Sequence, residues 1–189
     1  MQKKYNKLKN ASSIVKEQKV ELEKEINYLE SIVYEIEIST CIEDIDLIYE
    51  EIKSSFSNNK KQKLKVKENT SVSTPISYSI DGFKVLIGRN NKQNDELTFK
   101  IANSNDIWFH VKDFHGSHVI LFTNGEIRSQ ETINKCATLA AYYSKAMNSS
   151  NVPVDYTFVK NVKKYKNAKP GMVIYISQET VNVQPKCSF

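Results

Sequence analysis

The segment GRNNKQNDELTF, residues 88–99, concentrates hydrogen-bonding side chains in one short stretch of the chain. Its arginine, amides and aspartate follow directly after an apolar run, and all of them are costly to bury. An amide buried without a hydrogen bond costs about 1–3 kcal/mol, so these side chains must brace the fold or face a polar ligand. We expect Asn90 or Asn91 to cap a helix. We expect Arg89, Asn91 and Lys92 to face outward, where a planar guanidinium group suits a phosphate.

A lysine-rich run, KNVKKYKNAKPG at residues 160–171, contains five lysines, one tyrosine and no acidic residue. The ordinary interpretation of such a run is a solvated loop. Cations grouped around an aromatic ring are also typical of nucleic-acid surfaces, where lysines hold phosphates and rings stack on bases. The run therefore favours RNA as a ligand, with Lys163, Lys164, Lys166 and Lys169 as contacts.

All three histidines lie in the stretch HVKDFHGSH, at positions 110, 115 and 118. This spacing could gather a metal ion across a hairpin if a carboxylate such as Asp113 completed the site. Histidines on strands more commonly satisfy backbone carbonyl groups through their ring N–H. We therefore expect no metal and no cofactor, and we assign His110 and His118 a structural or RNA-contacting role.

Trp108 is the only tryptophan of the chain, and it shares a predicted strand face with His110. A tryptophan on a strand ordinarily belongs to the core. Beside a basic surface it could instead stack on a base or a ribose. The neighbouring histidine favours a partly exposed face, so Trp108 is included among the candidate RNA contacts.

The chain shows no motif of a nucleophilic, carboxylate-based or nucleotide-hydrolysing enzyme, so we expect no catalytic activity. The three cysteines, Cys41, Cys136 and Cys187, lie far apart and include no CxxC pair. This pattern argues against structural zinc and against a disulfide framework, and it fits a reducing interior. No apolar stretch approaches the roughly 20 residues of a membrane span, and the basic N-terminus lacks a signal-peptide core. We expect a cytoplasmic protein that does not enter the membrane.

Residues 1–56 are predicted to form a helical arm, because no glycine or proline occurs before Pro75. Apolar residues recur every seven positions in its first part, which is the pattern of a coiled coil. This stripe, called the seam below, consists of Leu8, Val15, Leu22, Ile26, Leu29, Val33 and Ile36. A break at STCIED, residues 39–44, precedes a second helix with Glu43 or Asp44 in its first turn.

Charge is strongly segregated along this arm. Six Lys against one Glu give residues 1–19 a net charge of +5, and eleven acids against one Lys give residues 20–51 a net charge of −10. A helix with one apolar seam is marginal in water until that seam is buried. Either two copies of the chain associate through the arm, or the partner helix belongs to a segment upstream of Met1. We favour the second alternative.

Residues 57–76 are predicted to be a linker, because this stretch is polar, rich in lysine and free of aromatic residues. Its simplest role is that of a solvated tether. Its cations could also hold phosphates, and a flexible basic tether often does both.

Residues 77–189 are predicted to form an α+β domain with a mixed, mainly antiparallel sheet. Two main helices are expected on one side of this sheet. The first elements are a hairpin with an Asp81–Gly82 turn, a helix that starts near Asn90, and a strand over residues 105–111. No long alternation of strands and helices is present, which argues against a parallel sheet.

The second half of this domain begins with a strand at SHVILF, followed by an amphipathic helix that Ser129 caps. The small residues of this helix form a face that can lie close on a sheet, and they include Cys136, Ala137, Ala140, Ala141 and Ser144. Residues 154–162 read as a strand by alternation. Residues 171–177 and 180–185 are expected to pair as a closing hairpin.

The motifs DGFKVLIGRNNKQNDELTFKIANSNDIWFHVKDFHGSHVIL and ATLAAYYSKAMNSSNVPVDYTFVKNVKKYKNAKPGMVIY resemble the NFACT-R domain. This is the C-terminal RNA-binding domain of the bacterial RqcH group, also called fibronectin/fibrinogen-binding proteins. The resemblance covers Ser77 to Pro185, and residues 1–56 resemble the second arm and return of the middle coiled coil of this group. One departure is His115, where many members carry proline.

The resemblance implies a role in ribosome-associated quality control, in which the protein binds an obstructed large ribosomal subunit and tRNA and supports alanine tailing of the stalled chain. The residues of the group that handle tRNA lie mainly in an NFACT-N domain, which has no counterpart in this sequence. What the resemblance leaves to this chain is contact with ribosomal RNA or tRNA. Our candidate RNA contacts are Arg89, Asn90, Asn91, Lys92, Asn94, Trp108, His110, His118, Lys163, Lys164, Lys166 and Lys169.

Two alternatives differ in class from an RNA-binding module. The older name of the group implies a surface-associated protein that binds fibronectin, although the sequence shows no export signal. An enzyme acting on nucleic acid would need an acidic cluster or a metal-binding constellation, and neither pattern is visible.

Overall fold

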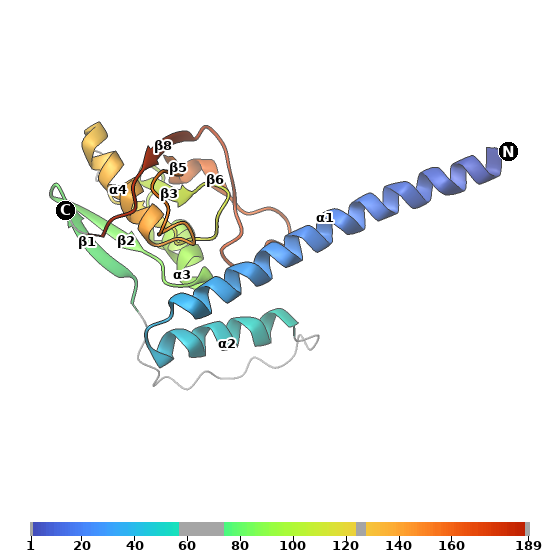
Figure 1. Ribbon diagram of the computed structural model, residues 1–189, viewed down its shortest axis with the longest axis horizontal. Coiled ribbons are helices and arrows are strands. Elements are labelled where there is room, and N and C mark those ends of the chain that lie inside the picture. The colour runs from blue at the N-terminus through green and yellow to red at the C-terminus, as the bar shows by residue number, and fades with distance from the viewer. Residues whose placement is uncertain (1, 57–73, 124–127, 188–189) are drawn as a thin grey trace.

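The computed structural model describes residues 2–56, 74–123 and 128–187. A long helix, α1 (Gln2–Ile38), projects from a compact domain, and α2 (Ile42–Phe56) folds back beneath its C-terminal part (Figure 1). Most of the predicted linker, residues 57–73, lies outside the described residues. Within the described part of the chain, neither helix has the length and apolarity to cross a membrane.

The two helices and the break between them confirm the predicted arm. The hydroxyl of Ser39 donates to the carbonyl oxygen of Glu35 at 2.7 Å, at the point where α1 ends. Glu43 and Asp44 occupy the first turn of α2, where negative charge is favourable because the helix dipole presents its positive end.

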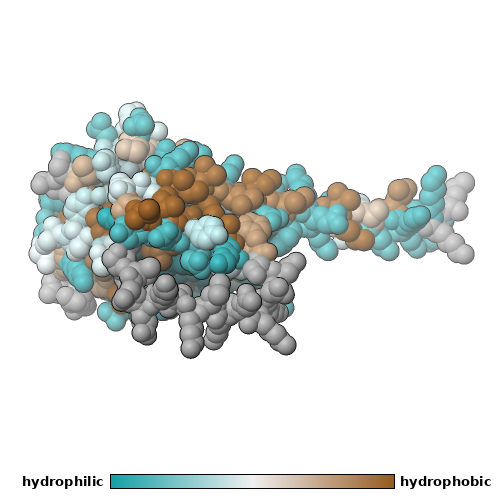
Figure 2. All heavy atoms as spheres, turned by 90° about the horizontal axis from the view of Figure 1, so that it is seen from below, coloured by the Kyte–Doolittle hydropathy of each residue, from teal (hydrophilic) through white to brown (hydrophobic). Residues whose placement is uncertain are grey.

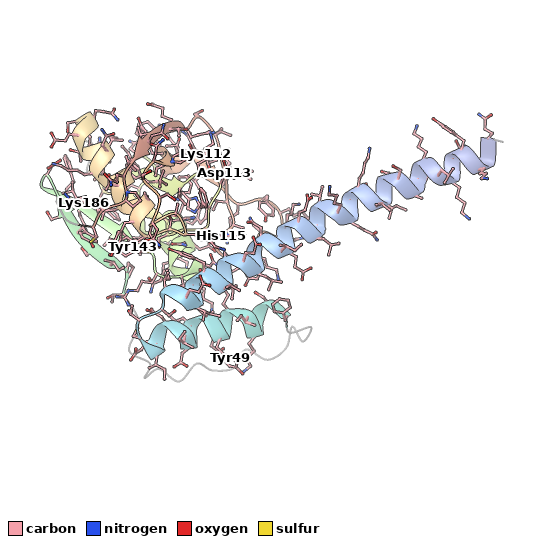
Figure 3. The ribbon with its side chains drawn as sticks, viewed as in Figure 1. Tyr49, Lys112, Asp113, His115, Tyr143 and Lys186 are labelled. Carbon is pink, nitrogen blue, oxygen red and sulfur yellow. The ribbon has the colours of Figure 1, made fainter. Side chains whose placement is uncertain are left out.

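The predicted seam of α1 is exposed, and α2 packs against another side of the helix. Tyr28 and Ile32 of α1 are buried together with Ile48 of α2, while each seam residue stays at least 41% exposed. At 3.6 residues per turn, the centre of the seam lies roughly a quarter to a third of a turn around the helix from Tyr28 and Ile32. Apolar side chains gather over the helix pair and recur along α1 (Figure 2). Tyr49 likewise extends from α2 away from the domain (Figure 3).

The compact domain is built on a six-stranded sheet in which each strand is antiparallel to its neighbours. The strands lie in the order β1 (Ile76–Ile80), β2 (Phe83–Ile87), β4 (Val119–Leu121), β3 (Ile107–Val111), β5 (Val152–Phe158) and β8 (Glu179–Val183). Helices and sheet together confirm the predicted α+β class. The predicted hairpin turn also forms, with φ of 51° at Asp81 and 86° at Gly82, the positive values that a tight two-residue turn requires.

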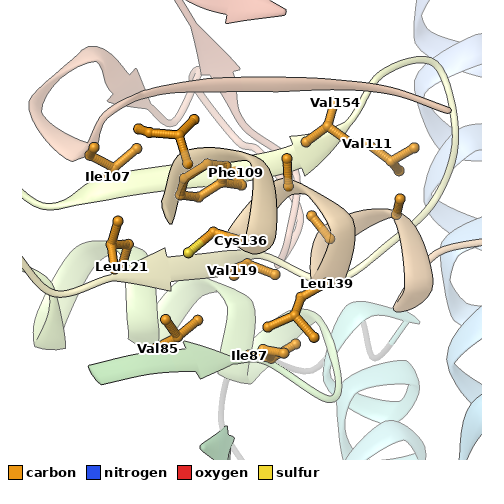
Figure 4. Close-up of a cluster of buried hydrophobic side chains, with 14 of the residues drawn as sticks. Val85, Ile87, Ile107, Phe109, Val111, Val119, Leu121, Cys136, Leu139 and Val154 are labelled. Carbon is orange, nitrogen blue, oxygen red and sulfur yellow. The ribbon is translucent and has the colours of Figure 1, made fainter. Parts of the chain in front are cut away.

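One face of the sheet is covered by α4 (Gln130–Tyr142). The Ser129 side chain caps this helix by accepting the backbone N–H of Thr132 at 3.1 Å, as predicted. Small residues such as Cys136 and Ala140 let the helix approach the strands closely, and they pack with Phe109 in the main hydrophobic core (Figure 4). This cluster is the main hydrophobic core of the domain.

The opposite face is covered by a second layer, so the expectation of helices on one side is wrong. This layer consists of α3 (Asn91–Glu96), the π-helical turn η1 (Leu97–Ile101), the 3₁₀ turn η2 (Val159–Asn161) and a small sheet of β6 (Val162–Lys163) and β7 (Ile174–Tyr175). Side chains alternate along β3, so Phe109 faces α4 while Trp108 faces η1 and β7. Both rings are fully buried, which requires a cover on each face.

The predicted closing hairpin is wrong, because its two strands pair elsewhere. β7 pairs with β6 in the outer layer, and β8 pairs with β5 in the main sheet. Ile176 and Ser177 connect β7 to β8. The hydroxyl of Thr157 on β5 donates to their carbonyl oxygens, at 3.1 and 3.2 Å. Ser177 has a φ of 53°, so the chain turns sharply there and passes from one layer to the other.

Candidate nucleic-acid interface

The polar corner at residues 88–99 is braced internally before it meets any other element. Asn90 caps α3, since its Oδ1 accepts the backbone N–H of Gln93 at 2.9 Å. The Oε1 of Gln93 in turn accepts the backbone N–H of Arg89 at 3.0 Å. These bonds confirm the predicted cap and fix the direction in which the remaining side chains leave the corner.

Asn91 joins the domain to the helical arm and does not face outward as expected. Its side chain is only 4% exposed, because α1 and α2 cover it. Its Nδ2 donates to the hydroxyl of Ser31 at 3.0 Å and lies 3.4 Å from Oε1 of Glu51. Tyr28 donates to the same carboxylate oxygen at 2.9 Å. The corner is therefore a junction between sequence regions about 40 to 60 residues apart.

Two cations of the corner clamp α2 to the domain. The Nη1 of Arg89 lies 3.1 Å from Oδ2 of Asp44, whose side chain is buried. The Nζ of Lys92 donates to the carbonyl oxygen of Leu47 at 3.3 Å. Breaking a buried ion pair leaves one charge without compensation, so Arg89 is committed to this junction.

Two buried glutamates of the arm lie at the same junction. Burial, reinforced by the charge of Glu51, raises the pKa of Glu35 to about 9. Burial is also the main cause that raises the pKa of Glu51, although Tyr28 and Asn91 bond to its carboxylate. Glu35 is therefore held in its neutral form at physiological pH.

Asn94, Trp108 and His118 lie in the interior of the domain. Asn94 accepts the backbone N–H of His118 at 3.0 Å, and the His118 ring lies 2.8 Å from the hydroxyl of Thr98. Trp108 is fully buried, and its ring is 4.8 Å from that of Tyr175. These three side chains therefore offer no open surface to a base, because the outer layer encloses them.

The three histidines lie in different environments. His110 is half-buried and stacks on Trp108, with ring centroids 5.7 Å apart, and burial lowers the pKa of His110 to about 4. Burial likewise lowers the pKa of His118. His115 instead faces α1, where its Nε2 lies 3.3 Å from Oε2 of Glu30 (Figure 3). Among the described residues, no group of three His, Cys, Asp or Glu side chains is arranged to hold a metal ion.

The predicted lysine run forms a surface on the outer layer, between η2 and β7. We call the exposed lysines of this run, Lys160, Lys163, Lys164 and Lys166, the lysine surface. Val162 is buried in the cluster beneath the outer layer, and Lys163 and Lys166 are exposed, whereas Lys164 pairs with Asp95. Lys169 differs, because its Nζ lies 5.4 Å from the Tyr28 ring and donates to the arm at Ser55 O, 3.3 Å away.

The candidate contacts thus divide into two groups. The first group lies in the interior of the domain or at the arm junction, and it consists of Arg89, Asn90, Asn91, Asn94, Trp108 and His118. The partly buried Lys92, Lys169 and His110 belong to the same group. The lysine surface retains Lys163, Lys164 and Lys166. Phe99 and Lys100 were not among the candidates predicted from the sequence, and both line a cleft that also includes Lys164. The available sequence signal was an adjacent Phe and Lys within a predicted helix.

Known proteins resemble nearly all of this chain. A family model described as the NFACT protein RNA binding domain matches residues 74–176. RqcH of Bacillus subtilis strain 168, an Rqc2 homolog, is 41% identical over 184 residues, which are 96% of this chain and 32% of that protein. RqcH of Streptococcus suis strain 05ZYH33 is 39% identical over 97% of this chain and 33% of that protein. The chain therefore spans about a third of the length of these relatives.

A solved structure supports the same relationship. The C-terminal part of the fibronectin/fibrinogen-binding protein of Streptococcus suis superposes with a TM-score of 0.85 and 39% sequence identity. The match covers 97% of this chain and 74% of that chain, so both the domain and the arm have counterparts there.

Proposed function

The chain belongs to the family of NFACT RNA-binding domains, and from this premise we propose that it binds RNA through the lysine surface. The observation that carries this proposal is the run of residues 160–171, which presents four exposed lysines and contains no acidic residue. Val162 anchors the start of the run to the sheet, so the neighbouring lysines stay on this side of the domain. Their ammonium groups on flexible stems can adapt to the repeating negative charge of an RNA backbone.

Only part of the lysine surface is engaged within the chain. Lys164 pairs with Asp95, whereas Lys163 and Lys166 extend from β6 and the following loop into solvent. Each lysine that contacts a phosphate releases condensed counterions, which makes binding weaker as salt rises. The electrostatic share of binding should therefore reside mainly in Lys160, Lys163 and Lys166.

We further infer that the RNA is ribosomal RNA or tRNA on an obstructed large ribosomal subunit. The support is the similarity to RqcH over nearly the whole chain. In this proposal the chain is the RNA-binding module of a cytoplasmic quality control factor that supports alanine tailing of stalled chains. The module itself performs no catalysis, and α1 acts as a spacer that carries the domain to its RNA.

Fluorescence polarisation with a labelled tRNA tests the RNA-binding proposal. The double variant Lys163→Gln/Lys166→Gln is compared with the wild type over a series of salt concentrations. The expected result is weaker binding at low salt and a slope of log K against log salt that is smaller by about two, one unit for each lost phosphate contact. Unchanged affinity and slope would remove the lysine surface from the proposal.

A matched control removes the same charge elsewhere in the domain. Lys84 lies on the β1–β2 hairpin and Lys186 lies near the C-terminus, close to β1 (Figures 1 and 3). Both are exposed, so Lys84→Gln/Lys186→Gln should fold normally. If this control lowers the slope as much as the Lys163/Lys166 variant, binding follows net charge and not the lysine surface.

The solved relative from Streptococcus suis favours a second candidate, binding of fibronectin, because that protein is described as a fibronectin/fibrinogen-binding protein. A basic surface also attracts many acidic partners without specificity. Surface plasmon resonance with immobilised fibronectin separates these cases. A signal that persists at high salt and in the presence of excess tRNA would support fibronectin as a partner, whereas a signal lost under both conditions would reflect charge alone.

A further inference from the structure

A shallow cleft of about 490 Å³ lies beside the lysine surface, on the outer layer of the domain. It is lined by Lys92, Asp95, Glu96, Phe99, Lys100, Lys164 and Pro170. Phe99 is the aromatic residue of this cleft, and its side chain is 40% exposed. The Nζ of Lys164 lies over the Phe99 ring, 5.9 Å from its centroid, so a cation borders this partly exposed ring.

The π-helical turn η1 explains why this ring is outside the core. Its Leu97 and Thr98 are buried beneath the layer, and the backbone N–H of Ala102 donates to the carbonyl oxygen of Leu97 at 2.9 Å. This wide i to i+5 turn leaves the two residues after Thr98, Phe99 and Lys100, on the solvent side. An exposed phenylalanine alone is ordinary, so the argument depends on what surrounds it.

The charges around the ring select the part of a nucleotide that fits. Inside the cleft Asp95 pairs with Lys164, and Glu96 lies 3.7 Å from Lys100. These acids offset the lysines locally, which disfavours a phosphate within the cleft. The neighbouring Lys163 and Lys166 belong to a run without acids, so phosphates are favoured just outside it.

We propose that this cleft holds one unpaired nucleobase of RNA, stacked on Phe99, while the flanking lysines bind the adjoining phosphates. The occupant is a flat, neutral ring attached to an anionic backbone, which matches a partly exposed aromatic ring bordered by cations. Bases within a duplex are already stacked and paired, so they cannot enter. This inference rests on the proposed RNA-binding function and specifies single-stranded or bulged RNA as its substrate class.

The substitution Phe99→Leu tests the cleft, because leucine keeps an apolar side chain at an exposed position but removes the ring. The probes are a fluorescein-labelled single-stranded RNA of twelve nucleotides and a blunt duplex of the same length, both at one fixed salt concentration. We expect Phe99→Leu to weaken single-strand binding by about fivefold or more, since stacking on an aromatic side chain carries a substantial share of such binding. Duplex binding should change by less than about twofold, because it depends on phosphate contacts.

Two further variants keep the result interpretable. Phe99→Tyr retains a ring and should keep single-strand affinity close to that of the wild type. Phe114→Leu removes another exposed ring, which lies in the β3–β4 turn among the residues that line a different cleft, and should alter neither affinity.

The outcomes separate this inference from the proposed function. If Phe99→Leu leaves single-strand affinity unchanged while Lys163→Gln/Lys166→Gln lowers it, the stacking cleft is wrong and the lysine surface stands. An equal loss for single strand and duplex in Phe99→Leu also overturns the cleft. Wild-type protein that binds neither probe would overturn both.

Discussion

Substitution of Glu35 by glutamine should stabilise the chain, and the gain should grow with pH. Glu35 is 4% exposed at the junction of the arm with the domain, and its Oε2 has no hydrogen-bond partner among the described residues. Its carboxyl group accepts the backbone N–H of Asn91, but burial and the nearby Glu51 charge raise the pKa of Glu35 from 4.5 to about 9. Glutamine keeps the acceptor oxygen and cannot ionise.

The magnitude follows from proton linkage. Between the unfolded pKa of 4.5 and the folded pKa of about 9, the folded state holds a proton that the unfolded state has released. The contribution of Glu35 to stability is therefore complete below pH 4.5 and is lost progressively as pH rises towards 9, by about 1.4 kcal/mol for each pH unit. At pH 7 the loss that glutamine avoids is at most about 3–4 kcal/mol, and at pH 5 it is below about 1 kcal/mol.

Urea denaturation followed by circular dichroism, at several pH values from 5 to 8.5, measures this difference. A residual pH slope is expected in Glu35→Gln, because the pKa of Glu51 is raised as well. The control Glu25→Gln changes an exposed glutamate on α1 and should shift the free energy of unfolding by less than about 0.5 kcal/mol. A Glu35→Gln protein that is no more stable than the wild type at pH 8 would refute the reasoning.

Three other predictions concern the junction and the core. Gly171→Ala should lower the free energy of unfolding by about 1–3 kcal/mol in urea titrations, because φ is +74° and the new Cβ would lie 2.0 Å from Oδ1 of Asn91; unchanged stability would mean that this contact relaxes freely. Asn90→Ala removes the α3 cap and should cost about 1 kcal/mol, whereas Asn90→Ser, which keeps a capping oxygen without burying a charge, should retain most of the stability. Iodoacetamide should alkylate the exposed Cys187 in the folded protein, while Cys136, whose pKa burial raises to about 12, should react only after unfolding, as mass spectrometry would show.

Elements with strong local signals were predictable from the sequence. The Asp81–Gly82 turn and the Ser129 cap each follow from residues that are close together in the chain, and both form as predicted. Alternation along β3 also correctly predicted that Trp108 and His110 share one face, where their rings stack. It did not reveal that this face is covered, because the covering strands β6 and β7 are only two residues long.

The arm junction could not be predicted, because its residues look like surface residues. Ser31 and Glu35 sit on a helix face that a sequence pattern assigns to solvent, yet both are buried against the domain. The direction of Asn91 depends on Ser31, sixty positions earlier, and no local pattern encodes such a contact. The candidate RNA contacts were misassigned for the same reason. Polar residues such as Arg89 and Asn91 could either brace the fold or bind RNA; they were assigned to RNA, and the structure places them in the junction.

The geometry of α1 turns the junction into the fulcrum of a lever. The helix first meets the domain near Lys24, whose Nζ lies 5.3 Å from the Tyr165 ring, and the described side chains of residues 2–23 are all exposed (Figure 1). At 1.5 Å per residue this free stretch is about 33 Å long, so a tilt of about 10° at the base would swing the tip by about 6 Å. An altered hydrogen bond at the pivot would consequently be easiest to detect far away, for example as a changed distance between a spin label at position 4 and one on the sheet.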